Sequence, residues 1–165
     1  MSRTLVLLRH GKSDWSADVD DRDRPLAKRG RRAAKLAGQV LAQAGLVPEA
    51  AVTSPAVRTV STLNLAMESG GWKCPVRVSE ALYGGGPTEV LDEIRAQADD
   101  AFVALFVGHE PTWSQLLGLL VGGGRHRMVT GALAAIDLDA ASWSDTGPGG
   151  GELAWLLPPR LIGDL

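Results

Sequence analysis

The chain has 165 residues, which predicts a single domain spanning 1–165 with a core large enough to need no disulfide or metal. Hydrophobic residues make up 45% and charged residues 22%, and this globular composition excludes intrinsic disorder. A formal net charge of −2 excludes a general attraction to nucleic acid or to an anionic membrane. The single cysteine, Cys74, excludes an internal disulfide framework and fits a reducing compartment.

The amino-terminal segment lacks the pattern of a secretory signal peptide. Its apolar run, 4–8, is short, and no small-residue cleavage pattern follows it. No apolar stretch approaches the roughly 18 residues that a membrane-spanning helix needs. We therefore expect a cytoplasmic protein that does not associate with membranes.

Short apolar segments that predict strands alternate with helical periodicities through most of the chain. In chain order we expect a strand at 4–8, a polar loop at 11–25, a helix at 30–44, a strand at 50–55, a helix at 57–69, a strand at 75–79, a helix at 88–98, a strand at 101–108, a helix at 113–121, and strands at 132–138 and 152–157. This alternation predicts an α/β fold, a three-layer α/β/α sandwich with a mostly parallel central sheet.

Residues suited to phosphate chemistry follow four of the predicted strands. Arg9 and His10 end the first strand, and Arg58 lies about one helical turn into the helix after the second. Glu80 follows the third strand, and His109 follows the fourth. Because ligands of open α/β sheets bind beyond the carboxyl ends of the strands, we expect these side chains to line one pocket.

The residue types in this predicted pocket fit phosphoryl transfer. Two arginines suit a phosphate, because each guanidinium can bind two of its oxygens at once. A neutral imidazole can attack phosphorus and form a phosphohistidine, through either Nε2 or Nδ1. The second histidine, with the arginines, can stabilise charge on the transferring group. A carboxylic acid such as Glu80 can protonate the leaving group and then activate water.

Three ordered segments resemble the histidine phosphatase superfamily, which has the phosphoglycerate mutase-like fold. "LLRHGKSDW" is similar to its RHG signature, "TSPAVRTVSTLNLA" to its S-P-x-x-R-x-x-x-T segment, and "FVGHEPTWSQLL" to its G-H-x-P segment. The compact length and the D-R-P-L-x-x-R-G stretch at 23–30 resemble the short phosphohistidine phosphatases of SixA type. This resemblance implies a phosphatase that works without a metal or another cofactor.

The resemblance also implies roles for individual residues. His10 corresponds to the phosphorylated nucleophile, and Arg9, Arg58 and His109 correspond to the phosphate pocket. Glu80, in the E-x-x-x-G pattern of "EALYG", falls where larger members of the family carry their proton donor. Three aspartates on the loop after the nucleophile are rival donors, namely Asp18, Asp20 and Asp21.

The substrate expected from this resemblance is a phosphohistidine carried by a protein. Only 70–75 separates the second predicted helix from the third strand, so the chain has little length for a lid. The alternative in the same superfamily is a small-molecule phosphomonoesterase. A mutase is disfavoured because a shallow, wet pocket would lose the phosphoryl group to water. Two further alternatives are a metal-dependent hydrolase built on His10 and His109, which the arginines disfavour, and a silent phosphate-binding protein.

A basic cluster opens the first predicted helix. Its members are Lys28, Arg29, Arg31, Arg32 and Lys35. One interpretation is a solvated helix start, and the other is a docking surface for an acidic partner. Positive charge at a helix amino terminus opposes the helix dipole, and this keeps the docking interpretation open.

Overall fold

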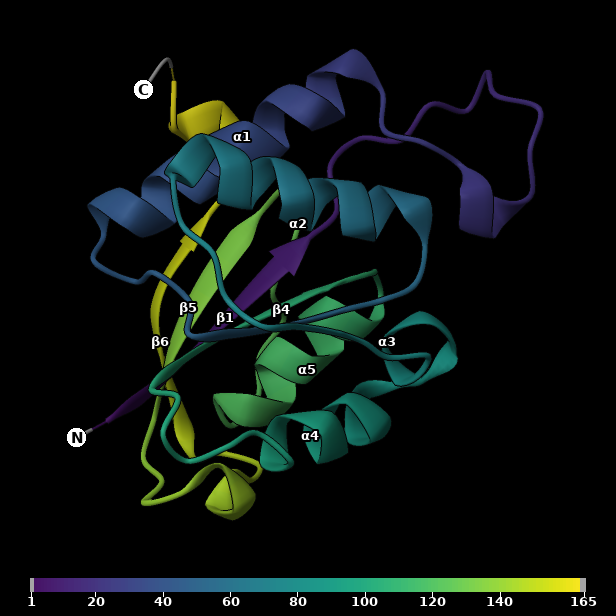
Figure 1. Ribbon diagram of the computed structural model, residues 1–165. Helices are drawn as coiled ribbons and strands as arrows, with labels where there is room; N and C mark the ends of the chain where they lie inside the picture. Colours follow the sequence, from purple (N-terminus) through teal and green to yellow (C-terminus); the bar gives the residue numbers. More distant parts are fainter. Residues whose placement is uncertain (1, 164–165) are drawn as a thin grey trace.

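The computed structural model describes residues 2–163, which form a six-stranded sheet between two layers of helices (Figure 1). The strands are β1 (Arg3–Arg9), β2 (Ala50–Thr53), β3 (Val76–Val78), β4 (Val103–Gly108), β5 (Leu133–Leu138) and β6 (Gly151–Leu157). The helices are α1 (Lys28–Gln43), α2 (Val57–Gly70), α3 (Ala81–Gly84), α4 (Pro87–Arg95) and α5 (Thr112–Leu120). Short 3-10 turns are η1 (Asp21–Asp23), η2 (Trp143–Asp145) and η3 (Pro159–Leu161).

The order of the strands across the sheet is β3-β2-β4-β1-β5-β6. The first four strands pair in parallel, whereas β5 runs antiparallel to both β1 and β6. The predicted α/β/α sandwich with a mostly parallel sheet is therefore confirmed. The parallel strands place the carboxyl ends of β1, β2 and β4 at one edge of the sheet, where the loops that carry the predicted site residues begin.

Strand β1 lies inside the sheet and has both faces covered, which explains its unbroken apolar sequence. Leu5 and Leu7 belong to the core on the face of α4 and α5, while Val6 and Leu8 belong to the core on the face of α1 and α2 (Figure 1). All four side chains have no exposed surface. No helix within residues 2–163 is long and apolar enough to cross a lipid bilayer.

Helices α1 and α4 differ most from the expected boundaries, and the ends of α2 and α5 differ by one residue. Helix α1 begins at Lys28, before the expected 30, because its first turn is closed by the Arg31 N–H, which donates to the Ala27 carbonyl at 3.0 Å. Helix α4 begins at Pro87, before the expected 88, because the backbone N–H that a proline lacks has no helical partner at the first position of a helix. The helix ends at Arg95 rather than at 98. The four-residue helix α3 was not expected, because so short an element leaves no periodicity to detect.

Candidate active site

The loops at the carboxyl ends of β1, β2 and β4 enclose a cavity of about 450 Å³. Its lining residues are Arg9, His10, Lys12, Ser13, Trp15, Asp21, Arg24, Arg58, Tyr83, His109, Glu110 and Thr130. The ring centroids of His10 and His109 lie 5.2 Å apart, and an Arg58 nitrogen lies 3.5 Å from His109 Nδ1. The structure therefore brings together the two arginines and two histidines that sequence reasoning placed at separate strand ends.

The imidazole of His10 is held in one tautomer by its own loop. His10 is 7% exposed, and its Nδ1 lies 2.7 Å from the Gly11 carbonyl oxygen. Because a carbonyl oxygen can only accept a hydrogen bond, Nδ1 carries the proton in this contact. In the neutral ring Nε2 then keeps its lone pair, which makes Nε2 the atom able to attack phosphorus.

Burial keeps the His10 imidazole neutral at physiological pH. Burial and, to a smaller extent, the positive charges of Arg58, Arg9 and Arg24 together lower the pKa of His10 from 6.5 to about 4, against the opposing effect of the Gly11 hydrogen bond. We expect the His10 ring to titrate near pH 4 when followed by NMR of the imidazole carbons. Titration near 6.5 would contradict burial as the dominant influence.

The loop that carries His10 is fixed from two helices. The Gly11 N–H donates to Thr62 Oγ1 on α2 at 3.1 Å. From α1, Gly30 lies so close that a Cβ placed on it would stand 2.7 Å from the backbone nitrogen of Lys12. The Lys12 carbonyl also accepts the Ala27 N–H at 2.8 Å. The position of the His10 ring thus depends on backbone contacts that only glycines allow.

We expect Gly30→Ala to lower kcat by about a hundredfold, because a loop shifted by about 1 Å misplaces the nucleophile. Helix propensity alone would make the same change stabilising by about 1 kcal/mol, so lost activity would not come from a weaker helix. Gly84→Ala is the matched control, since its Cβ would meet no atom within 4 Å. Steady-state kinetics of both variants measure the effect, and unchanged kcat in Gly30→Ala would contradict the close packing.

The guanidinium of Arg58 is bound to Asp21, the first residue of η1. Its Nη1 donates to the Asp21 carbonyl at 2.6 Å, and its Nη2 donates to Asp21 Oδ2 at 3.1 Å. Arg9 donates from Nη1 to the Met128 carbonyl at 3.0 Å. The Nε atoms of Arg9 and Arg58 are buried and have no hydrogen-bond partner among residues 2–163. Two cations with buried, unused Nε donors on the wall of one cavity suit an anionic ligand.

His109 is half-buried and neutral. Its Nδ1 accepts from Arg58 at 3.5 Å, and an arginine can only donate, so Nε2 carries the proton and donates to Ser54 Oγ at 2.7 Å. The pKa of His109 is lowered to about 3, mainly by burial and to a smaller extent by the nearby His10 and Arg58. The hydroxyl of Ser54 thereby orients the second histidine toward the arginine.

Two acids line the pocket, Glu110, which accepts from the Ser114 N–H at 2.7 Å, and Asp21, which faces Arg58. The Asp21 carboxylate accepts from Tyr83 Oη at 2.6 Å, from Arg24 at 2.6 Å and from Arg58 at 3.1 Å. The hydrogen bond from Tyr83, with those from both arginines, holds the pKa of this carboxyl well below its usual range. Asp21 is therefore an anion seated on Arg58, and in this state it has no proton to give.

The other candidate acids do not line this cavity. Glu80 lies at the start of α3 and accepts from Arg22 at 2.8 and 2.9 Å, in an exposed bidentate pair that lowers the pKa of Glu80. Asp18 and Asp20 are exposed on the loop before η1. Of the four acids that the sequence offered as proton donors, the structure brings Asp21 alone to the two histidines.

Besides Trp15, sequence reasoning did not assign six residues that line the cavity, namely Lys12, Ser13, Arg24, Tyr83, Glu110 and Thr130. Two of them left a signal, because Lys12 follows the nucleophile by two positions and Tyr83 lies inside the "EALYG" segment. Trp15 lies at the rim with 70% of its surface exposed, and the Arg24 guanidinium stacks 3.6 Å from its ring centroid. Within residues 2–163, no three histidine, cysteine or acidic side chains are grouped to hold a metal ion.

A family model, a curated protein and solved structures are all similar to this chain. The model of the histidine phosphatase superfamily (branch 1) matches residues 5–86. An uncharacterized protein of Mycobacterium tuberculosis is 36% identical over 163 residues, covering 93% of this chain and 100% of that protein. A solved structure from Nakamurella multipartitia, provisionally named phosphohistidine phosphatase SixA, is 33% identical with a TM-score of 0.87 and covers 96% of this chain and 97% of that one. The protein histidine phosphatase SixA complexed with tungstate shares the fold, with 23% identity, a TM-score of 0.84, and coverage of 96% and 99%.

Proposed function

The chain belongs to the histidine phosphatase superfamily, and from this premise we propose that it removes phosphoryl groups from protein phosphohistidine through a covalent intermediate on His10. The proposed reaction needs no metal. One observation carries the proposal most directly. A neutral imidazole whose Nδ1 is bound to the Gly11 carbonyl shares one cavity with the guanidinium groups of Arg9 and Arg58.

In the first proposed step, His10 Nε2 attacks phosphorus and the bond from phosphorus to the substrate's imidazole nitrogen breaks. That nitrogen keeps the electron pair, and the ring leaves as neutral imidazole because its other nitrogen carries a proton in the reacting form of the substrate. Arg9 and Arg58 bind the phosphoryl oxygens, and His109 can stabilise their charge once its Nδ1, which accepts from Arg58 in the resting site, takes up a proton as the phosphoryl group binds. In the second step, water attacks the phosphorus on His10. Inorganic phosphate leaves with both protons of the water, and His10 returns to its neutral form with its Nδ1 proton retained.

The pocket's acid chemistry supports phosphohistidine over a phosphate ester. An ester releases an alkoxide, which needs a proton, whereas phosphohistidine releases an imidazole, which is a far better leaving group. The carboxylate of Asp21 is held ionised by Tyr83 and the arginines, so it cannot supply that proton. Exchange of one imidazole for another at phosphorus is nearly balanced in energy and demands little acid assistance.

The substrate class is tested by turnover of a phosphorylated histidine-carrier protein against a panel of small phosphate monoesters, with phosphate release as the measurement. We expect kcat/KM for the carrier protein to exceed that for every ester. The cavity of about 450 Å³ is also large enough for a small metabolite, which is the observation that favours a small-molecule phosphomonoesterase. Faster turnover of an ester would establish this second candidate instead.

We expect Glu80→Gln to affect the two substrate classes unequally. For an ester, Glu80 released from Arg22 is the proposed proton donor, and its loss should lower turnover by about a hundredfold. For phosphohistidine, the same change should alter turnover by less than about threefold, since the leaving imidazole needs little acid. Rates on both substrates measure the asymmetry, and Asp21→Asn is the control that separates the two acids. Equal losses in Glu80→Gln would contradict the leaving-group argument.

A further inference from the structure

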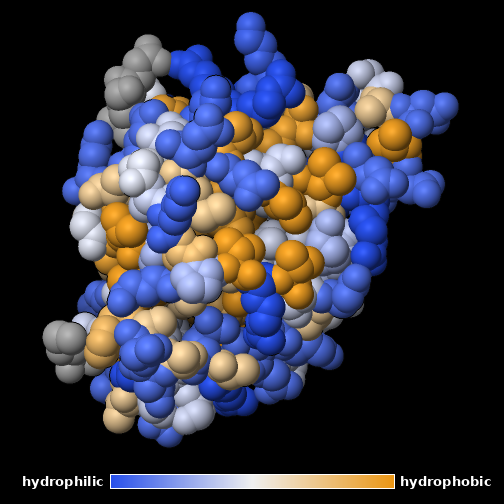
Figure 2. Space-filling model, in the orientation of Figure 1, coloured by the Kyte–Doolittle hydropathy of each residue, from blue (hydrophilic) through white to orange (hydrophobic). Residues whose placement is uncertain are grey.

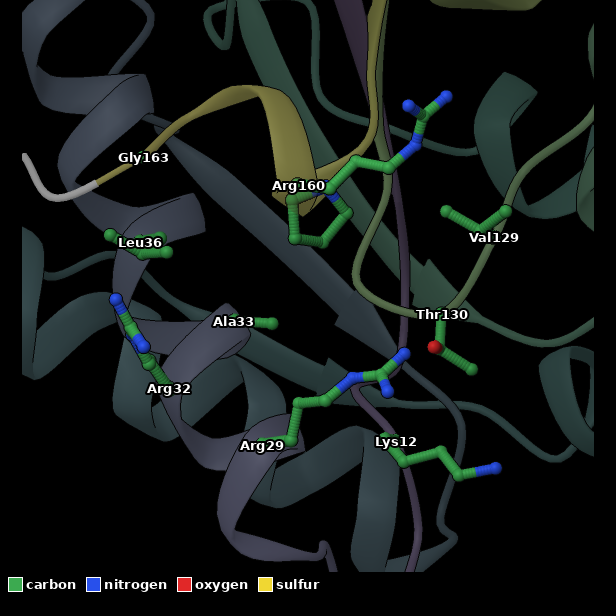
Figure 3. Close-up of a pocket in the computed structure, with 10 residues that line it drawn as sticks. Lys12, Arg29, Arg32, Ala33, Leu36, Val129, Thr130, Arg160 and Gly163 are labelled. Atoms are coloured by element: carbon green, nitrogen blue, oxygen red, sulfur yellow. The ribbon is translucent and has the colours of Figure 1, made fainter.

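A second cavity, of about 430 Å³, lies directly beside the candidate active site (Figure 3). The two cavities share a wall, because Lys12 and Thr130 line both. The other lining residues come from one face of α1, from the segment before β5, and from η3. They are Arg29, Arg32, Ala33, Leu36, Val129, Pro159, Arg160 and Gly163. A group bound here would lie next to whatever reacts at His10.

The walls of this second cavity are positively charged. Four of its lining residues are cationic, Lys12, Arg29, Arg32 and Arg160, and none of those within residues 2–163 is acidic. Within residues 2–163, the side chains of Lys12, Arg29 and Arg160 form no hydrogen bond, ion pair or ring contact. The whole chain has a net charge of −2, so this local excess of positive charge does not follow from composition. Cations left without partners around a hollow attract an anionic ligand.

The cavity is also a groove with an apolar floor that follows α1. Arg29 and Arg32 are spaced by one helical turn, and Ala33 and Leu36 continue the same stripe. In Figure 3 the Arg29 side chain extends from α1 toward Thr130 and the Lys12 backbone. Figure 2 shows strongly hydrophilic side chains that project over the first turns of α1. An apolar floor under a cationic rim suits an amphipathic segment of chain.

We propose that this basic groove binds acidic side chains of the substrate protein, next to the phosphohistidine that reacts with His10. The proposal rests on the function proposed above and names how that substrate is selected. A protein surface fits better than a single small anion, because exposed Lys28 and Lys35 extend the positive charge along α1 beyond the groove. They are seven residues apart, which spans about 10 Å of helix.

The structure also divides the basic cluster that the sequence analysis left with two interpretations. Arg29 and Arg32 face the groove, whereas Arg31 turns back and donates to the Leu26 carbonyl at 2.9 Å. The docking interpretation is thus assigned to the face of α1 that adjoins the active site. Charges at the rim of a binding surface mainly speed association and select partners, so their contribution should fall as salt screens them.

The test compares two synthetic peptides that carry one phosphohistidine, flanked either by glutamates or by glutamines. We expect wild-type kcat/KM to favour the glutamate peptide by about tenfold, through KM. The preference should vanish in the double variant Arg29→Gln, Arg160→Gln, and it should also shrink when salt rises from about 0.1 to about 1 M. Lys73→Gln is the matched control, because exposed Lys73 precedes β3, at the opposite edge of the sheet.

Peptide binding and the turnover of a small substrate separate the role of the groove from the chemistry at His10. Fluorescence anisotropy with the unphosphorylated peptides should show tighter binding of the glutamate peptide to wild type than to the double variant. Phosphoramidate is too small to contact the groove while it reacts at His10. Its rate of turnover by the double variant should therefore stay within about twofold of wild type. Equal handling of both peptides by wild type in rate and binding would overturn the groove proposal. Absent phosphohistidine turnover with preserved glutamate binding would overturn the proposed function alone.

Discussion

Replacing His10 with asparagine should lower kcat/KM by at least about ten thousandfold, because no other group can form the covalent intermediate. In the structure, His10 offers an uncharged ring whose Nδ1 proton is committed to Gly11, so Nε2 is the free nucleophilic atom. Asparagine keeps a similar volume in this buried position but has no comparable nucleophile. Phosphate release from phosphohistidine peptide measures the loss.

Covalent labelling tests whether His10 is the residue that carries the phosphoryl group. Brief exposure to substrate with labelled phosphorus should leave a label on wild type that acid removes and base does not, and none on His10→Asn. His126→Asn is the matched control, since His126 lies outside both cavities and contacts the Gly123 carbonyl at 3.1 Å. Label that persists in His10→Asn would refute His10 as the phosphorylated residue.

Replacing Arg58 with lysine should lower kcat/KM by about a hundred- to a thousandfold, although the positive charge is kept. Arg58 uses both terminal nitrogens on Asp21, which shows the forked geometry that two phosphoryl oxygens would use. A lysine ammonium is a point charge and cannot reproduce that fork. Inhibition by orthovanadate, whose five-coordinate form imitates the transferring phosphoryl group, should weaken in parallel with activity.

Arg77→Lys gives the control for this change, because Arg77 lies on β3 in an exposed ion pair with Glu93, outside the cavity. Its kcat/KM should stay within about twofold of wild type, as expected for a surface pair. The melting temperature of each variant separates a lost contact from a lost fold. Full activity in Arg58→Lys would mean that charge alone suffices at this position.

The fold was predictable wherever a periodicity was long and continuous. The apolar run of β1 predicted a strand buried on both faces, and the structure divides its side chains between two cores. The direction of β5 was not predictable, since an apolar strand has the same sequence pattern whether it pairs in parallel or antiparallel. No single strand pattern predicted that the site residues after β1, β2 and β4 would lie close together. That prediction came from the general layout of a parallel sheet, in which the carboxyl ends of the strands lie at one edge.

The acid that pairs with Arg58 was harder to predict from sequence. Asp18, Asp20 and Asp21 are neighbours on one polar loop, and nothing in their composition separates them. Asp21 is distinguished by Tyr83 and Arg58, which approach from distant parts of the chain. The sequence equally offered Glu80, whose pairing with Arg22 is set by the course of the same loop. Contacts made by irregular loops depend on tertiary packing and leave no periodic pattern.

Because Asp21 is paired with Arg58, the phosphate-binding arginine already has a counterion before substrate binds. A phosphoryl group that reaches Arg58 must exchange with a carboxylate already bound there, so the electrostatic gain on binding is a difference between two anions. The same exchange runs backward after hydrolysis, when the carboxylate competes with inorganic phosphate for the guanidinium. We therefore expect this enzyme to release its product readily and to be only weakly inhibited by free inorganic phosphate.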